Sequence, residues 1–262
     1  MNNDDKKKDY LTKIKLIKKH NKYYHEKDRP IISDQAFDLL KKEIVDLEDK
    51  YDFLRNNESP TKTVGFKPSK NFKKVKHKVP MLSLGNAFNE ADLINFEKKI
   101  RNFLSLKNSS IIEYSVEPKI DGISASLIYH NGKFVKGLSR GDGNEGEDIT
   151  ENLKTIKDIP ALITEKSFPE EIDIRGEVFI ENDDFKKIND KFANPRNAAS
   201  GSLRQKDSSV TNKIPLKFIA YTYGYVNKMN IDDQTSLLMR LKLWGFKTNP
   251  FNKKINNVKK LI

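Results

Sequence analysis

The sequence contains no cysteine, one tryptophan and only eight arginines among its 262 residues. Without cysteine the chain can form neither a disulfide framework nor a thiolate zinc site. No apolar run approaches the roughly 20 residues that a membrane-spanning helix needs, and the polar residues 1–8 lack the apolar core of a signal peptide. These absences predict a soluble protein of the cytoplasm with no membrane partner.

Positive charge is abundant, because 49 lysines and arginines stand against 37 aspartates and glutamates, for a formal net charge of +12. A basic chain of this size is expected to bind a polyanion, and nucleic acid is the usual one. Four of the eight arginines, namely Arg140, Arg175, Arg196 and Arg204, fall within short motifs described below. That concentration is the stronger indication of an anionic partner.

The first 70 residues have the pattern of a small helical unit. Leu11, Ile14, Ile17 and Tyr24 share one face of a helix that should end near Glu26. A second helix is predicted to begin after the good N-cap Ser33. Its apolar stripe recurs at steps of three and four residues: Phe37, Leu40, Ile44, Leu47 and Tyr51.

From residue 111 onward the pattern is that of an α+β domain with antiparallel strands and outer helices. Alternating segments at 126–129 and 134–139 flank Asn131 and Gly132, a strong hairpin pattern. Strands are also expected at 172–180 and 216–225, and helices near 93–103 and 237–244. The lysine- and proline-rich stretch 58–80 is expected to be a connector. We predict a helical domain over residues 1–70 and a sheet domain over residues 71–262.

The most informative run is Val-Glu-Pro-Lys-Ile-Asp-Gly-Ile-Ser-Ala-Ser-Leu at residues 116–127. Apolar residues at period two frame a turn at 119–122, which presents the Lys119 amine at the mouth of a sheet, with Asp121 two residues on. An ordinary lysine has a pKa near 10.4, so about one molecule in a thousand carries the free amine at pH 7.5. Burial, cations or a carboxylate can raise that fraction. A surface lysine in a hairpin turn is the alternative interpretation.

Residues 117–122 resemble the motif of nucleotidyltransferases that form a lysine–nucleotide intermediate: DNA ligases, RNA ligases and mRNA capping enzymes. Three further runs, at 138–152, 174–179 and 192–205, are similar in order and spacing to the NAD-dependent DNA ligases of bacteria. The resemblance extends from about Ile14 to the last residues. It implies an N-terminal helical domain that binds nicotinamide mononucleotide (NMN), followed by an antiparallel-sheet nucleotidyltransferase domain of the ATP-grasp-like ligase and capping-enzyme fold.

The resemblance implies that Lys119 attacks the α-phosphorus of NAD, expels NMN and stores AMP. Asp121 then acts on the lysine proton or, later, on the 3′-OH of a nick. Residues expected to bind the adenosine half are Ser83, Leu84, Glu117, Arg140 and Glu177, of which Glu117 contacts adenine and Glu177 the ribose. Glu177 is also the one candidate ligand of Mg²⁺ or Mn²⁺. Taken alone, it is an ordinary exposed acid on a strand.

The NMN half is expected to contact Tyr24, His25, Asp34, Gln35, Ala36, Phe37 and Asp38. Carboxylates near the cationic nicotinamide and an aromatic ring that stacks on it suit this ligand. For Asp34 and Asp38, complementing the helix dipole is the alternative role. The family usually has tyrosine where this chain has Phe37, so stacking is retained and a phenol hydrogen bond is lost. Arg196 and Arg204 are expected to contact DNA phosphates.

The family continues with two more lysine-bearing pocket motifs, an oligonucleotide-binding barrel, a zinc module, a helix-hairpin-helix region and a BRCT domain, none of which occurs in these 262 residues. We therefore expect a C-terminally incomplete adenylation domain. The first functional hypothesis is the N-terminal part of a monomeric ligase that seals nicked double-stranded DNA in replication and repair. The second is an inactive or split-gene fragment that binds NAD or NMN without sealing. The third, an RNA ligase or capping relative, is disfavoured by the NMN-binding segment.

Overall fold

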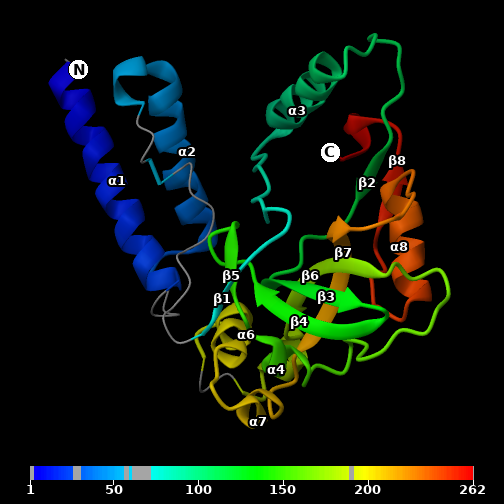
Figure 1. Cartoon of the computed structure of the whole chain (residues 1–262). Helices are drawn as coiled ribbons and strands as arrows, with labels where there is room; N and C mark the ends of the chain where they lie inside the picture. Colours follow the sequence, from blue (N-terminus) through cyan, green and yellow to red (C-terminus); the bar gives the residue numbers. More distant parts are fainter. Residues whose placement is uncertain (1–2, 26–30, 56–58, 61–71, 189–191, 262) are drawn as a thin grey trace.

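The computed structural model describes residues 3–25, 31–55, 59–60, 72–188 and 192–261. It opens with two packed helices, α1 (Asn3–His25) and α2 (Asp34–Lys50), followed by the 3-10 turn η1 (Asp52–Leu54) (Figure 1). Ser33 is the N-cap of α2, as predicted, and its hydroxyl accepts a hydrogen bond from the Ala36 amide. The predicted end of the first helix is confirmed as well, because α1 ends at His25.

The core of this helical pair contains the predicted stripe of α2. Tyr10, Ile17, Ile44 and Leu54 are buried, and the other members of the α2 stripe pack against them. The prediction for Leu11 is wrong, since its side chain is 53% exposed. Tyr10 takes the inward position, where its hydroxyl donates to Glu48 Oε1 at 2.7 Å. Burial, with the Glu48 carboxylate beside it, raises the pKa of Tyr10 to about 12.

The second part of the chain is built on a four-stranded sheet with the order β4-β3-β6-β7, in which all neighbours are antiparallel. Its strands are β3 (Ile123–His130), β4 (Lys133–Ser139), β6 (Glu171–Phe179) and β7 (Lys217–Val226). Asn131 and Gly132 join β3 to β4 with φ angles of 49° and 75°, which confirms the predicted hairpin. The antiparallel sheet predicted from the sequence is thus confirmed.

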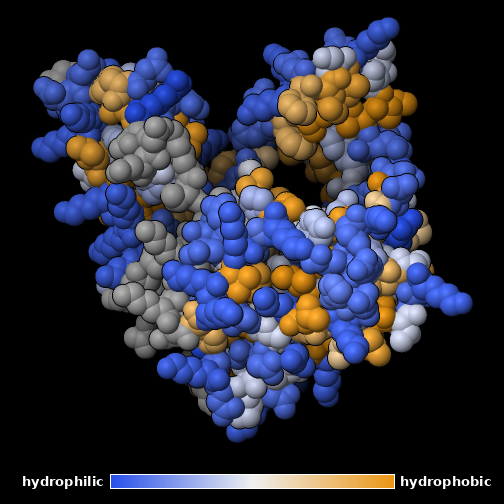
Figure 2. All heavy atoms as spheres, in the orientation of Figure 1, coloured by the Kyte–Doolittle hydropathy of each residue, from blue (hydrophilic) through white to orange (hydrophobic). Residues whose placement is uncertain are grey.

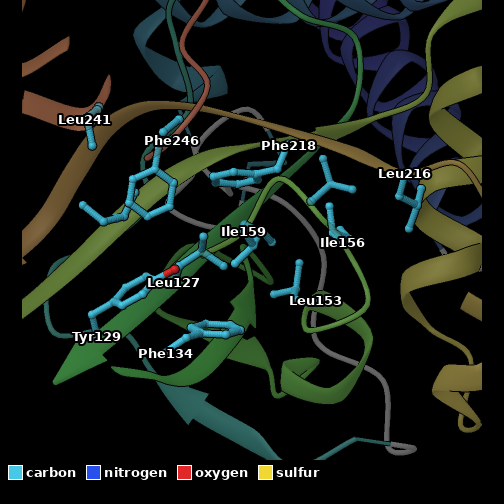
Figure 3. Packing of buried hydrophobic residues seen from close by; sticks show 14 of the residues in the cluster. Leu127, Tyr129, Phe134, Leu153, Ile156, Ile159, Leu216, Phe218, Leu241 and Phe246 are labelled. Carbon is cyan, nitrogen blue, oxygen red and sulfur yellow. The ribbon is translucent and has the colours of Figure 1, made fainter. Parts of the chain in front are cut away.

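Helices cover this sheet and close its core (Figure 1). They are α4 (Thr150–Leu153), α5 (Asn182–Phe185), α6 (Pro195–Leu203), α7 (Ser208–Thr211) and α8 (Gln234–Leu243). The buried core consists mainly of isoleucine and leucine side chains, with a few aromatic rings among them. Tyr129 lies 5.4 Å from Phe134 and 5.8 Å from Phe246, measured between ring centroids (Figure 3). This packing fixes β3 and β6, the two central strands on which the candidate site is built.

Two short ribbons flank the sheet. The strand β1 (Lys74–Lys76) pairs with β5 (Glu145–Glu147), and β2 (Tyr114–Val116) pairs with β8 (Lys253–Ile255), which the 3-10 turn η3 (Val258–Leu261) follows. The predicted helix near residue 93 is α3 (Glu90–Phe103), although none of its residues is buried. Phe96 and Phe103 are 50% and 89% exposed, and apolar atoms gather over α3 in Figure 2. Within the described residues, no helix has the length and apolar character needed to cross a membrane.

Candidate active site

The loop of residues 117–122 joins two different sheets, because it leaves β2 of one ribbon and enters β3 at the centre of the main sheet. Lys119 and Asp121 are both exposed on this loop. Gly122 lies directly against β6, and a Cβ there would meet the Val178 carbonyl oxygen at 2.3 Å. The glycine of the motif thus lets the loop approach the strand that carries Glu177.

A buried amide holds the same loop from the other side. The Asn249 side chain is 4% exposed, and its Nδ2 donates to the Pro118 carbonyl at 3.3 Å. The position of the peptide next to Lys119 therefore depends on a residue 131 positions away in the sequence. Glu117, at the start of the loop, is exposed, yet nearby protein atoms remove part of its hydration and raise its pKa.

Glu177 lies on β6 opposite Ser124 of β3, and the Ser124 hydroxyl donates to Glu177 Oε2 at 2.9 Å. Burial raises the pKa of the Glu177 carboxyl above its ordinary value. The Ser124 hydrogen bond and the positive charges of Arg196, Lys119 and Arg140 oppose that rise. Glu177 is therefore not the exposed strand acid of the alternative interpretation: it is a half-buried carboxylate surrounded by three cations.

Arg196 lies in the first turn of α6 and forms an ion pair with Asp121, with 3.3 Å between Nη1 and Oδ1. Its side chain is only 19% exposed. The structure thus places Arg196 beside the lysine loop, and a contact between this guanidinium and a DNA phosphate requires it to share or leave Asp121.

Arg204 lies at the other end of α6, where its Nε approaches the buried carboxylate of Glu147 at 3.5 Å. Arg204 lies eight positions after Arg196, which corresponds to a rise of about 12 Å along a helix. The two arginines therefore lie in different places: Arg196 at the Lys119 loop and Arg204 at the β1–β5 ribbon.

Arg140 directly follows β4 and begins the glycine-rich turn, residues 140–144, that leads to β5. The His77 ring nitrogen Nε2 lies 3.1 Å from the Arg140 carbonyl, and the Met81 amide donates to the Gly143 carbonyl at 2.8 Å. The chain segment that leads to Ser83 and Leu84 thus runs alongside this turn. Leu84 is 79% exposed. The strand β5 follows the turn, so the glycines do not open a helix as they would in a dinucleotide-binding fingerprint.

Tyr221 on β7 is a member of this site that the sequence pattern did not single out. Burial and the nearby Glu177 charge raise its pKa to about 12, and a hydrogen bond with Ser124 acts in the opposite direction. The only signal in the sequence was the aromatic alternation Tyr-Thr-Tyr-Gly-Tyr at 221–225, which is equally typical of any half-buried strand. The ring lies beside the carboxylate that the cations surround.

The residues expected to contact NMN lie on the helical pair. Gln35 and Ala36 are exposed in the first turn of α2, Asp38 is half-buried, and Phe37 packs partly against the helical core. Tyr24 and His25 fall in the last turn of α1 and Asp34 begins α2, but their side chains lie outside the described residues. The backbone therefore brings the end of α1 and the start of α2 to one end of the pair.

No group of three or more His, Cys, Asp or Glu side chains suited to a metal ion occurs among the described residues. The site offers the carboxylates of Asp121 and Glu177. Mg²⁺ is commonly held by one or two carboxylates together with phosphate oxygens of a substrate, so this donor set fits Mg²⁺ only in that shared form. Cations, two carboxylates and an exposed amine form a place where an anionic phosphate compound can meet a nitrogen nucleophile.

Comparison with known proteins is consistent with this chemistry. Residues 69–262 match the family model described as NAD-dependent DNA ligase adenylation domain, and residues 4–65 match DNA ligase-like, N-terminal NAD+-binding domain. The DNA ligase of Pelagibacter ubique is 75% identical over 262 residues, which is all of this chain and 39% of that protein. The DNA ligase of Parvibaculum lavamentivorans is 46% identical over 94% of this chain and 36% of its own length. The chain thus spans less than half the length of these relatives.

Proposed function

Because this chain belongs to the NAD-dependent DNA ligase family, through its match to the family's NAD+-binding and adenylation domains, we propose that it performs the self-adenylation step of such a ligase. In that step Lys119 accepts AMP from NAD. The observation that carries the proposal is the Lys119 loop, which Gly122 brings against Glu177 and whose Asp121 pairs with Arg196.

The reaction follows from these positions. The unprotonated Lys119 amine attacks the α-phosphorus of NAD, the nitrogen–phosphorus bond forms, and the bond from that phosphorus to the NMN phosphate oxygen breaks. Asp121, two residues after Lys119 and paired with Arg196, takes the lysine proton. Arg196 and Arg140 offset the negative charge that grows on the phosphate oxygens and on the leaving NMN. The product is a lysyl-AMP phosphoramidate.

The adenosine half has its own set of partners. We assign the ribose to Glu177, which Ser124 orients through its hydrogen bond, and the adenine to Glu117 and the segment of Ser83 and Leu84. Tyr221 adds an aromatic ring next to Glu177. Glu177 would hold Mg²⁺ or Mn²⁺, which would supply a compact positive charge to offset that of the substrate phosphates.

We assign the NMN half to residues 1–70 as a separate helical domain, and the adenylation chemistry to residues 71–262. Asp34 and Asp38 place negative charge at one end of the helical pair, where the cationic nicotinamide ring needs it. Tyr24, His25, Gln35 and Ala36 complete this surface, and Phe37 supplies its stacking ring. An ATP- or GTP-dependent relative has no use for such a domain, which disfavours the RNA ligase and capping hypotheses.

The rest of the ligase cycle is also a proposal. AMP passes from Lys119 to the 5′-phosphate of nicked double-stranded DNA, and the 3′-OH then displaces it in replication and repair. Arg204 is 35% exposed and suits a DNA phosphate contact, whereas Arg196 has to share its guanidinium with Asp121 or leave it. We expect a monomer that acts on DNA in the cytoplasm.

The proposal is tested with NAD and ATP, each labelled in the α-phosphate. The chain should form a labelled band of about 30 kDa with NAD and Mg²⁺, and no comparable band with ATP.

Asp38→Asn should raise the NAD concentration at half-maximal labelling about tenfold, because one carboxylate near the nicotinamide loses its charge. Asp46→Asn makes the same change farther along α2, on an exposed residue, and should leave that concentration unchanged. Equal labelling by ATP and NAD would refute the assignment of the donor.

A further inference from the structure

Strand β6 carries four charged residues at alternate positions of one face: Glu171, Asp173, Arg175 and Glu177. Only the last belongs to the site described above. Asp173 and Arg175 are 5% and 7% exposed, so a charged pair lies in the interior two residues from Glu177. A buried ion pair contributes little net stability compared with apolar residues of similar size. Its presence therefore calls for a role other than stabilising the sheet.

The Asp173 carboxylate fixes the direction of the Arg175 guanidinium. Both Nε and Nη2 of Arg175 donate to Asp173 Oδ2, at 3.2 and 3.1 Å. The Ser126 hydroxyl donates to the other oxygen, Oδ1, from the neighbouring strand β3. On the other side, β7 has Gly224, where a Cβ would lie 2.2 Å from Asp173 Oδ2 and 2.3 Å from Arg175 Nη2. The pair thus has a single orientation, and Gly224 makes room for it.

Arg175 also donates hydrogen bonds to the backbone of residues 79–80, which lie outside the sheet and far away in the sequence. Nη1 donates to the Pro80 carbonyl at 3.0 Å, and Nη2 donates to the Val79 carbonyl. On its opposite flank the same segment is bonded to the glycine-rich turn, through the amides of His77 and Met81 and the carbonyls of Asn144 and Gly143, each at 2.8 Å.

Hydrogen bonds therefore fix residues 77–81 from two sides. Immediately after this segment the chain becomes exposed to solvent. Met81 is buried, whereas every residue from Leu82 to Glu90 is exposed. Ser83 and Leu84 are the third and fourth residues beyond the Pro80 carbonyl that Arg175 holds. Their position relative to Glu177 is set through this anchored segment, since Arg175 and Glu177 lie on the same strand about 7 Å apart.

We propose that Arg175, oriented by Asp173, is a positioning residue that sets the distance between the Ser83–Leu84 segment and Glu177, and so shapes the pocket for the adenosine half of the substrate. This inference rests on the proposed function, because it concerns the same pocket. Arginine is suited to the task, since its planar fork bonds one carboxylate and two successive carbonyls at once. Lysine has the same charge but only a single nitrogen, which cannot span these three acceptors.

The test is the rate of lysyl-AMP formation by the 262-residue chain over a range of NAD concentrations. Arg175→Lys should raise the half-saturating NAD concentration about tenfold and change the rate at saturation by less than about threefold, because the nucleophile is untouched and ground-state binding is weakened. The matched control is Lys76→Met, which removes an exposed cation at the end of β1, just before the anchored segment, without removing a bond to the Val79 or Pro80 carbonyl. It should leave both values unchanged.

A second variant separates positioning from stability. Arg175→Met combined with Asp173→Asn replaces the charged pair with neutral groups of similar size, which is expected to keep the sheet folded. It should nevertheless show the same rise in half-saturating NAD, and faster hydrogen exchange at the Met81 amide than in the wild type. Unchanged NAD saturation and unchanged exchange at Met81 in both variants would overturn the inference. Absence of labelling in the wild type would instead overturn the proposed function, while exchange at Met81 still tests the anchoring by Arg175.

Discussion

Lys119→Arg is expected to abolish labelling of the chain by NAD, with a decrease of at least about a thousandfold that places the product below detection. Arginine keeps the length and positive charge of the side chain, so binding of the anionic diphosphate should persist. Its guanidinium stays protonated at every accessible pH and offers no lone pair for attack on phosphorus. Lys119 is exposed, so the substitution should not disturb the fold. Electrophoresis under denaturing conditions after incubation with labelled NAD measures the effect.

Lys133→Arg is the matched control, because Lys133 is also exposed and lies at the far end of the β3–β4 hairpin. Its labelling should equal that of the wild type. Mass spectrometry of the labelled wild-type peptide should find AMP on Lys119 alone. If the Lys119→Arg chain still forms a stable adenylated product, the nucleophile lies elsewhere and the proposed reaction is wrong.

The elements of the fold were predictable from the sequence wherever the pattern was local. The stripe of α2, its Ser33 cap and the Asn131–Gly132 hairpin each depend on residues a few positions apart, and all three are confirmed. The face of α1 was predicted less well, because two adjacent residues competed for the inward position. Tyr10 is favoured over Leu11 by its hydrogen bond to Glu48, which lies on the other helix.

The contacts that build the site could not be predicted, because each joins residues far apart in the sequence. Asp121 and Arg196 are 75 residues apart, and Arg175 and the Pro80 carbonyl are 95 apart. Motifs indicated that Asp121 and Arg196 matter, but periodicity contains no information on which charged residues pair. Tyr221 was missed for a related reason, since its importance comes from its neighbours Ser124 and Glu177 on other strands.

Glu177→Gln is expected to make the chain more stable and much less active. Burial raises the pKa of the Glu177 carboxyl, so the folded state binds its proton more tightly than the unfolded chain does. The stability that this gives is present below the unfolded pKa and is lost as the pH rises through the folded pKa. At pH 7.5 the ionised carboxylate therefore destabilises the fold, and the neutral amide should raise the Tm. The glutamine oxygen can still accept the hydrogen bond from Ser124.

The sign of this effect distinguishes it from ordinary damage to the fold. The Tm difference between Glu177→Gln and the wild type should be positive at pH 7.5 and should shrink as the pH falls and the wild-type carboxyl becomes protonated. Glu181→Gln, a change at a more exposed acid just beyond β6 with a side chain 54% exposed, should alter the Tm little at either pH.

Activity should change in the opposite direction to stability. The rate of lysyl-AMP formation should fall on the order of a hundredfold in Glu177→Gln, the size expected when one preorganised charged group is removed from a site. The reason is that Lys119, Arg140 and Arg196 then face no carboxylate on β6, and the ribose and Mg²⁺ lose their charged partner. A destabilised, fully active variant would contradict both halves of the prediction. A more stable, inactive one would show that the energetic cost of burying Glu177 is retained for function rather than for the fold.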